Sequence, residues 1–287
     1  MTPRQSLMVR VGVHVSIAKS LDTAIDKALE EKCDTFQIFT RNPRGWKFSD
    51  LDPKEAAGFK EKLKQSQLDP AVDHMPYLPN LSCPEDELYQ KSTTTLTAEV
   101  ERCIQLGIPY LVTHLGSHLG AGREVGLRRI SNALTQALKR AKGQFQICLE
   151  NMAGTKNSMG SKFEEVQEIL ESVKQRDHIA VCLDTCHAYA AGYDLHVEKA
   201  VEKTLTQFND TIGFENLRVV HLNDSESGLG SGHDRHEHIG LGYIGTSGFK
   251  AILHHKAIRD LPLIMETPID ERRGNAGNIE TVRRLAK

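Results

Sequence analysis

Residues 179–187 read Ile-Ala-Val-Cys-Leu-Asp-Thr-Cys-His, and this stretch indicates both a fold and a site. Its first five residues form an apolar run that favours a short, buried β-strand. The run stops at Asp184, and His187 follows three residues later. A carboxylate at the end of a buried strand is costly unless it is paired, and an oxygen and a nitrogen ligand on one turn suit a cation such as zinc. Asp and His also close ordinary hydrogen-bonded turns, so the interpretation depends on whether the pattern recurs.

Seven further apolar runs have the length of a strand, and most are separated by stretches of helix length. The eight predicted strands cover residues 8–15, 35–40, 70–74, 110–114, 145–150, 179–184, 217–223 and 263–266. Predicted helices occupy residues 20–31, 53–66, 89–106, 126–141, 162–174, 197–211 and 248–257. This alternation predicts an α/β fold with a parallel sheet, and eight units in 287 residues fit a closed (β/α)8 TIM barrel. We expect a single domain over residues 1–287, with residues 1–7 as a flexible N-terminal extension.

The composition, with 39% hydrophobic and 26% charged residues, is typical of a soluble globular protein. No apolar run approaches the roughly 18 residues of a membrane span, and the N-terminus lacks the apolar core of a signal peptide. The six cysteines lie mostly in apolar runs, which indicates reduced thiols. We therefore expect a cytoplasmic or nucleoid-associated protein without membrane contact. A net charge of −2 argues against a nucleic-acid partner, but three bound divalent cations would reverse its sign.

Potential metal ligands stand at the ends of six successive predicted strands. They are His74, His114, Glu150, Asp184 with His187, His221 and Glu266. In a barrel these ends meet at the C-terminal face, where active sites lie. One histidine at a strand end is commonly structural, but six sites in phase, with carboxylates that would repel one another without cations, favour a multinuclear metal centre. Asp234 and His236 face the same way if extended and could complete a second site with His187.

Short motifs along almost the whole chain match those of one known family. They are Gly-Val-His-Val-Ser at 12–16, His-Leu-Gly-Ser-His at 114–118, Leu-Glu-Asn-Met-Ala-Gly at 149–154, Cys-Leu-Asp-Thr-Cys-His at 182–187, Ala-Ala-Gly-Tyr-Asp at 190–194, Val-His-Leu-Asn-Asp at 220–224, His-Asp-Arg-His at 233–236 and Met-Glu-Thr-Pro at 265–268. None is decisive alone, but together they are specific. The chain resembles the endonuclease IV family, the zinc-dependent apurinic/apyrimidinic endonucleases of base-excision repair.

The resemblance implies a cluster of three zinc ions. His74, His114 and Glu150 would hold the first, Glu150, Asp184, His221 and Glu266 the second, and His187, Asp234 and His236 the third. It also implies a deoxyribonuclease IV-type hydrolase that cuts the phosphodiester 5′ to abasic sites in double-stranded DNA and leaves a 3′-hydroxyl and a 5′-deoxyribose phosphate. A 3′-end-cleaning activity is expected in addition. Glu150 would have the catalytic role, because it would bridge two metals and position the attacking hydroxide.

The resemblance further assigns DNA contacts to two loops. Arg44 follows the second predicted strand, and Tyr77 and Leu78 follow the third. Basic and apolar wedges of this kind suit entry into the minor groove and kinking of a duplex, although Tyr77 and Trp46 could instead pack the loops against the barrel. Residues 18–20, Ala-Lys-Ser, replace a glycine pair that is usual in the family, which leaves a DNA contact by the first loop open. We expect a monomer.

The remaining histidines and cysteines are assigned other roles. His178, His196, His254 and His255 lie away from the strand ends and are expected to be solvated. His14 is expected to orient a metal ligand without itself binding the metal. Cys182 and Cys186 are expected to pack in the core.

Three other functions are compatible with a metal site at the mouth of such a barrel. A sugar isomerase or epimerase typically holds one or two hard divalent ions, mostly by carboxylates, beside a base for proton transfer. Five of the nine predicted ligands are histidines, which favours zinc. A related ultraviolet-damage endonuclease would share the fold and metals, but its motifs fit less well. A damage-binding protein without cleavage is disfavoured by the complete ligand set.

Overall fold

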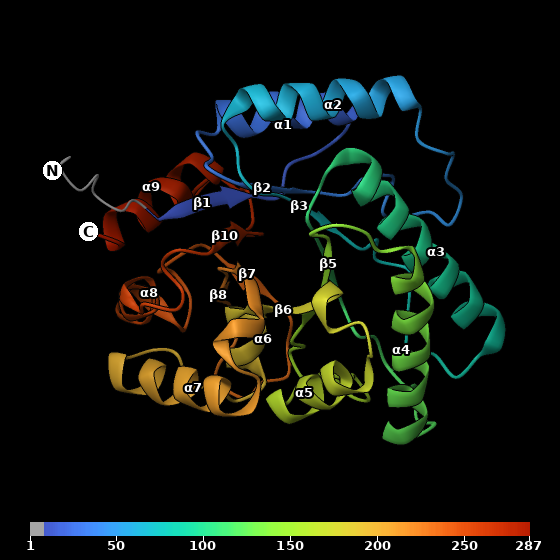
Figure 1. The fold of residues 1–287 in the computed structure, drawn as a ribbon. Coiled ribbons are helices and arrows are strands. Elements are labelled where there is room, and N and C mark those ends of the chain that lie inside the picture. The colour runs from blue at the N-terminus through green and yellow to red at the C-terminus, as the bar shows by residue number, and fades with distance from the viewer. Residues whose placement is uncertain (1–8) are drawn as a thin grey trace, which may run out of the picture.

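The computed structural model describes residues 9–287 as a ring of parallel strands surrounded by helices (Figure 1). The strand order is β1-β10-β7-β6-β5-β4-β3-β2, with parallel pairing throughout. A parallel bridge between His14 and Gln37 joins the two edge strands, so the barrel is nearly closed. The prediction of a TIM barrel is confirmed. The extension predicted over residues 1–7 lies outside the described residues.

The barrel strands agree with the predicted runs to within a few residues. They are β1 (Arg10–Val13), β2 (Phe36–Ile38), β3 (Ala71–His74), β4 (Tyr110–Thr113), β5 (Gln146–Glu150), β6 (Ile179–Asp184), β7 (Leu217–His221) and β10 (Pro262–Met265). Two short strands, β8 (Asp224–Ser225) and β9 (His236–Glu237), form an antiparallel pair between β7 and β10 in the chain order. Because each barrel strand is covered on both faces, its sequence reads as an almost continuous apolar run.

Helices cover the outside of the barrel (Figure 1). They are α1 (Leu21–Glu30), α2 (Pro53–Ser66), α3 (Asp86–Leu106), α4 (Arg123–Ala137), α5 (Phe163–Ser172), α7 (Glu198–Thr211), α8 (Gly245–His254) and α9 (Asn275–Leu285). A short α6 (Thr185–Ala190) follows β6 directly. Neither α6 nor α9 was predicted; α9 begins with Asn-Ala-Gly-Asn, residues that include poor helix formers. No helix within residues 9–287 combines the length and apolar character needed to cross a bilayer.

Two buried layers hold the fold together. The larger lies between the strands and the helices. The smaller fills the barrel interior and consists of Val72, Val112, Cys148, Ala180, Cys182, Val219 and Ile264. Cys182 therefore packs in the core, as predicted, and Cys186 is likewise fully buried. Since side chains alternate along a strand, the residue two positions beyond each interior side chain also faces the barrel axis.

Candidate metal centre

The alternation of side chains brings six polar residues to one end of the barrel. His74, His114, Glu150, Asp184, His221 and Glu266 each lie two residues after an interior residue of the smaller core. They therefore point inward at the C-terminal mouth, above a floor of Val, Cys and Ile side chains. Glu150, Asp184 and His221 are completely buried. Burying three such side chains costs free energy unless each has a hydrogen-bond or charge partner, so partners have to be close by.

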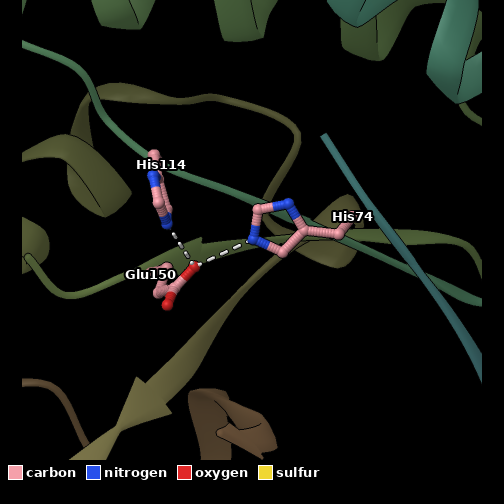
Figure 2. Close-up of side chains that lie close together, drawn as sticks. All are labelled: His74, His114 and Glu150. Atoms are coloured by element: carbon pink, nitrogen blue, oxygen red, sulfur yellow. Dashed lines mark hydrogen bonds and ion pairs between the residues drawn. The ribbon is translucent and has the colours of Figure 1, made fainter. Parts of the chain in front are cut away.

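Glu150 lies at the centre of this group. Its Oε2 is 3.3 Å from His74 Nε2 and 3.2 Å from His114 Nε2, and Figure 2 shows both rings pointing toward this oxygen. Its Oε1 is 3.1 Å from His221 Nδ1 and 3.3 Å from His187 Nδ1. The two carboxylate oxygens thus face different histidine pairs, which is the geometry of a bridging ligand.

A second group lies on the Oε1 side of Glu150. His221 Nδ1 is 3.3 Å from Glu266 Oε2 and 3.9 Å from Asp184 Oδ2. Two asparagines hold Asp184: Asn223 Nδ2 donates to its Oδ2 at 2.8 Å, and Asn151 Nδ2 donates to its carbonyl at 3.1 Å. The carboxylate of Asp184 is therefore fixed before any cation binds.

A third group combines α6 with the β8–β9 hairpin. Asp184 caps α6 by accepting a hydrogen bond from the His187 backbone N–H at 2.7 Å, which places His187 at the mouth. His187 Nε2 is 3.1 Å from Asp234 Oδ1, and His236 Nε2 is 3.4 Å from the same oxygen. The preceding segment turns at Gly230 and Gly232, whose φ angles of 71° and 68° favour glycine. These turns direct the chain back to the barrel mouth, where Asp234 lies.

The three groups fit divalent metal ions. Two ligand atoms held about 2.0–2.2 Å from one tetrahedral ion lie roughly 3.3–3.6 Å apart, close to the nitrogen–oxygen distances of 3.1–3.4 Å around Glu150 and Asp234. The Nε2 atoms of His187 and His236 are buried, and although Asp234 Oδ1 lies near both, neither atom makes a well-aligned hydrogen bond among the described residues. Such atoms call for a ligand that the protein does not supply itself.

A fourth combination, Asp184 with Cys186 and His236, also has its ligand atoms close together. Cys186 is nevertheless poorly suited to bind a metal, because only the thiolate is a good ligand. Burial raises the pKa of its thiol to about 12, and the Sγ donates to the Arg235 carbonyl at 3.4 Å. The histidine and carboxylate groups remain the candidate ligands.

Glu150 and Glu266 stay ionised at neutral pH, because the pKa of each carboxyl lies below its ordinary value. Burial alone would raise the pKa of Glu150, but the charges on His114 and His221 outweigh it and hold this pKa well below its ordinary value. Burial of Glu266 is similarly outweighed by His221 and His74, so its pKa falls to about 2. The mouth therefore offers charged oxygen ligands across the physiological pH range.

The three residues assigned to DNA contact lie on neighbouring loops at the same mouth. Arg44 is exposed between β2 and α2, while Tyr77 is 62% and Leu78 39% exposed after β3. The Tyr77 backbone N–H donates to the Pro43 carbonyl at 3.2 Å, which ties the two loops together. The Tyr77 ring also lies 5.0 Å from that of Phe39, next to the metal groups. The structure thus brings these residues together, and their contact with DNA stays a prediction.

A buried ion pair anchors the loop that carries Arg44, and the sequence alone did not indicate it. Arg41 Nε lies 2.5 Å from Glu99 Oε1 on α3, and both side chains are almost fully buried. Thr40 Oγ1 donates to Glu99 Oε2 at 2.5 Å, and Arg102 Nη2 donates to the Thr40 carbonyl at 2.5 Å. Charged partners this far from water hold the start of the loop rigidly to α3.

Sequence reasoning also missed Gln37, whose amide lies between His14, His221 and Glu266. His14 Nδ1 is 3.0 Å from Gln37 Nε2 but 3.8 Å from Glu266 Oε1, so the close contact of His14 is with Gln37. Burial lowers the pKa of His14 to about 4, which keeps its ring neutral. A polar residue in the apolar run Phe-Gln-Ile of β2 was the available signal.

Comparison with known proteins points to the same family as the sequence motifs. A family described as Xylose isomerase-like TIM barrel matches residues 25–287. A protein of Methanoculleus marisnigri named Probable endonuclease 4 is 53% identical over 280 residues, which cover 97% of this chain and 99% of that protein. One of Nitrosopumilus maritimus with the same name is 48% identical, covering 97% and 100%.

Solved structures agree with these relatives. Endonuclease IV from Thermus thermophilus has a TM-score of 0.85 at 36% identity and covers 96% of this chain and 98% of its own. A D-tagatose 3-epimerase-like protein reaches a TM-score of 0.70 at 20% identity over 96% of each chain, a likeness that shows the fold alone. With identities near one half over almost their full length, the relatives decide the matter: the chain belongs to the endonuclease IV family.

Proposed function

We propose that this protein is a DNA-repair endonuclease that hydrolyses the phosphodiester 5′ to abasic sites in duplex DNA. The products would be a 3′-hydroxyl and a 5′-deoxyribose phosphate, and 3′-end cleaning would use the same site. One observation carries the proposal: nine His, Asp and Glu side chains, with Glu150 among them, converge at the barrel mouth. The relatives named Probable endonuclease 4 support the class of activity.

Three groups of residues would hold three zinc ions. They are His74, His114 and Glu150; Glu150, Asp184, His221 and Glu266; and His187, Asp234 and His236. Bound zinc would lower the pKa of a coordinated water and neutralise the charge that develops on the phosphate. Five imidazoles among the nine side chains favour zinc over magnesium or calcium, which prefer oxygen ligands.

Glu150 would hold the first two groups in register. Its two oxygens face different histidine pairs, so one rigid carboxylate sets the distance between the groups. Asp184 would do the same between the second and third groups, since its Oδ2 lies 3.9 Å from His221 Nδ1 and 3.7 Å from His236 Nε2. Preorganised ligands cost no rearrangement when the substrate binds.

The rim of the barrel suits a bent duplex. Among residues 9–287, nine of the ten exposed large hydrophobic side chains lie in segments that follow a barrel strand; they are Phe48, Tyr77, Leu78, Leu119, Val197, Leu229, Leu241, Tyr243 and Ile269. Exposed apolar side chains on one face mark a contact surface, and apolar wedges unstack bases in the minor groove. Arg44, Tyr77 and Leu78 are the proposed contacts beside the damaged nucleotide, which has to leave the helix to reach the sunken cluster.

The direct test is incubation of the purified protein with a duplex that contains one abasic site and with the same duplex undamaged. We expect a single cut 5′ to the lesion in the first duplex and an intact second duplex. Extension of the cut strand by a DNA polymerase would show the 3′-hydroxyl. Equal cutting of both duplexes, or conversion of a ketose sugar without any cutting, would contradict the proposal.

We expect about three tightly bound zinc ions per chain, because nine side chains form three groups of ligands. Elemental analysis of protein purified without chelators measures the number. Matched protein dialysed against a strong chelator provides the baseline. A reproducible value near one ion per chain would refute the trinuclear arrangement.

Arg44→Ala and Tyr77→Ala are each expected to weaken binding of abasic DNA more than they slow the bound reaction, since neither side chain is one of the nine proposed metal ligands. Removal of the Arg44 charge should also reduce the salt dependence of binding. Titration of binding and single-turnover rates separate the two effects. Lys47→Ala, in the same loop, and Leu29→Ala, at the end of α1, are the controls for charge and exposure. Slower single-turnover rates at unchanged affinity would place Arg44 and Tyr77 in the chemistry.

A further inference from the structure

Gln37 is a fully buried amide that touches two of the proposed zinc ligands. It lies in the middle of β2, opposite the interior residue Val72, so its side chain points into the barrel. Its Oε1 is 2.8 Å from His221 Nε2, and its Nε2 is 2.7 Å from Glu266 Oε1. Both partners belong to the group that also contains Glu150 and Asp184. The contacts therefore run inside the barrel from β2 to the C-terminal ends of β7 and β10.

The hydrogen-bonding partners of Gln37 determine which amide atom is the oxygen and which is the nitrogen. The Glu266 carboxylate can only accept hydrogen bonds, so the Gln37 atom that faces it has to be the nitrogen. The opposite amide atom is then the oxygen, which can only accept, and it faces His221 Nε2. The second amide hydrogen is directed at His14 Nδ1, 3.0 Å away. All three contacts are satisfied by one orientation of Gln37.

This orientation determines the tautomer of His221. Because the Gln37 oxygen accepts from Nε2–H, the neutral ring keeps its proton on Nε2 and leaves Nδ1 free. Nδ1 is the atom that faces Glu150 Oε1 at 3.1 Å and Glu266 Oε2 at 3.3 Å. The lone pair of His221 is thereby directed at the ligand group.

His221 differs in this respect from its neighbours. The Nδ1 atoms of His74, His187 and His236 each lie within hydrogen-bond distance of a backbone carbonyl, at 2.7, 2.9 and 3.2 Å, and their Nε2 atoms face the centre. A backbone carbonyl is part of the main chain and cannot be removed by changing a side chain. In His221 the corresponding acceptor is the side chain of Gln37, and the ligand atom is the other ring nitrogen.

We propose that Gln37 is a positioning residue that selects the Nδ1-coordinating tautomer of His221 and orients Glu266, and so sets the affinity of one of the three metal sites. The inference rests on the proposed metal centre. Residues that orient metal ligands in this way typically contribute about 10–100-fold in metal affinity. His14 holds the amide from the far side, at the bridge where β1 and β2 close the barrel.

The test compares zinc extraction from zinc-loaded wild-type protein, Gln37→Leu and Gln37→Glu by a chromogenic chelator. Leucine has a similar volume but removes all three hydrogen bonds of Gln37. We expect one of the three zinc ions of Gln37→Leu to be extracted at a chelator concentration about 10–100-fold lower than in the wild type, with the other two unchanged. Gln146→Leu is the matched control, since Gln146 lies at the opposite end of β5 from Glu150 and its side chain contacts Arg218 and Asp177 instead.

A second measurement reads the tautomer directly. Nitrogen-15 correlation spectra of the histidine rings should show a protected Nε2 proton on His221 in the wild type. Gln37→Glu keeps an oxygen for this proton but places a carboxylate against Glu266, so we expect the signal to persist while zinc affinity falls. In Gln37→Leu the protected signal should disappear.

The outcomes separate the two proposals. A wild type that holds far fewer than three zinc ions would refute the metal centre itself. A wild type with three ions, together with unchanged extraction and an unchanged His221 signal in Gln37→Leu, would refute the role of Gln37 alone. Circular dichroism of each variant confirms that the barrel is folded, and Gln37→Glu carries the test if Gln37→Leu does not fold.

Discussion

Replacing Glu150 by glutamine is expected to lower the single-turnover rate of abasic-site cleavage by about 10³-fold or more, which corresponds to about 4 kcal/mol of lost transition-state stabilisation. Glutamine keeps the shape of the side chain but removes its negative charge and one acceptor oxygen. Glu150 Oε2 lies within 3.3 Å of His74 and His114 in the first group, and Oε1 lies 3.1 Å from His221 in the second, so the substitution should uncouple two metal sites at once. Binding of abasic DNA, which depends on the rim, should change far less.

The measurement is single-turnover cleavage with saturating protein, combined with zinc analysis and thermal unfolding of the same preparation. Glu99→Gln is the matched control, because Glu99 is equally buried but contacts Arg41 and Thr40 outside the metal groups. We expect this control to retain its zinc while losing stability, since a buried charge loses its partner. Near-normal turnover in folded, zinc-loaded Glu150→Gln protein would show that Glu150 has no bridging role.

The second large effect concerns the route of strand cleavage. We expect a tetrahydrofuran analogue of the abasic site, which has no aldehyde, to be cut about as fast as the natural lesion. Hydrolysis acts on the phosphodiester and does not need the aldehyde. A lyase needs a Schiff base between an amine and the sugar, and therefore a lysine or terminal amine with a depressed pKa. Within residues 9–287, the six strand ends at the centre supply His, Asp and Glu and no lysine.

Borohydride trapping with natural abasic DNA, run beside cleavage of the analogue, distinguishes the two routes. Hydrolysis should give no trapped complex and an extendable 3′ end on both substrates. A known lyase serves as the positive control for trapping, and chelator-treated protein serves as the negative control for cleavage. A covalent complex with the analogue left uncut would overturn the hydrolytic mechanism while leaving the barrel unaffected.

The barrel could be predicted from the sequence because each of its elements is marked locally. Apolar runs such as 179–184 end in a polar residue, and a helical stretch follows most of them. A period of two then directs Glu150 inward, since Cys148 faces the interior and Ile147 and Leu149 face the helices. Local patterns were weaker at α9, whose first turn contains Gly277 and two asparagines, and that helix was not predicted.

The sequence did not predict which side chains contact one another inside the metal centre. Periodicity tells which side chains face the axis, but it does not tell which of them meet once the strands tilt and close. Gln37 and Glu266 are 229 residues apart and come within 2.7 Å only because β1, between their strands, completes the ring. The same holds for Arg41 and Glu99, which join a loop to a distant helix without any shared sequence pattern.

The sequence by itself therefore determined the barrel, the face that carries the site, and the residue types available there, because strand periodicity and strand-end chemistry are local properties. Only the tertiary structure decided that each oxygen of Glu150 faces a different histidine pair and that His221 presents Nδ1. It also decided that Gln37 holds that ring. These features depend on the relative rotation of side chains from distant strands, and that rotation is set by closure of the whole barrel.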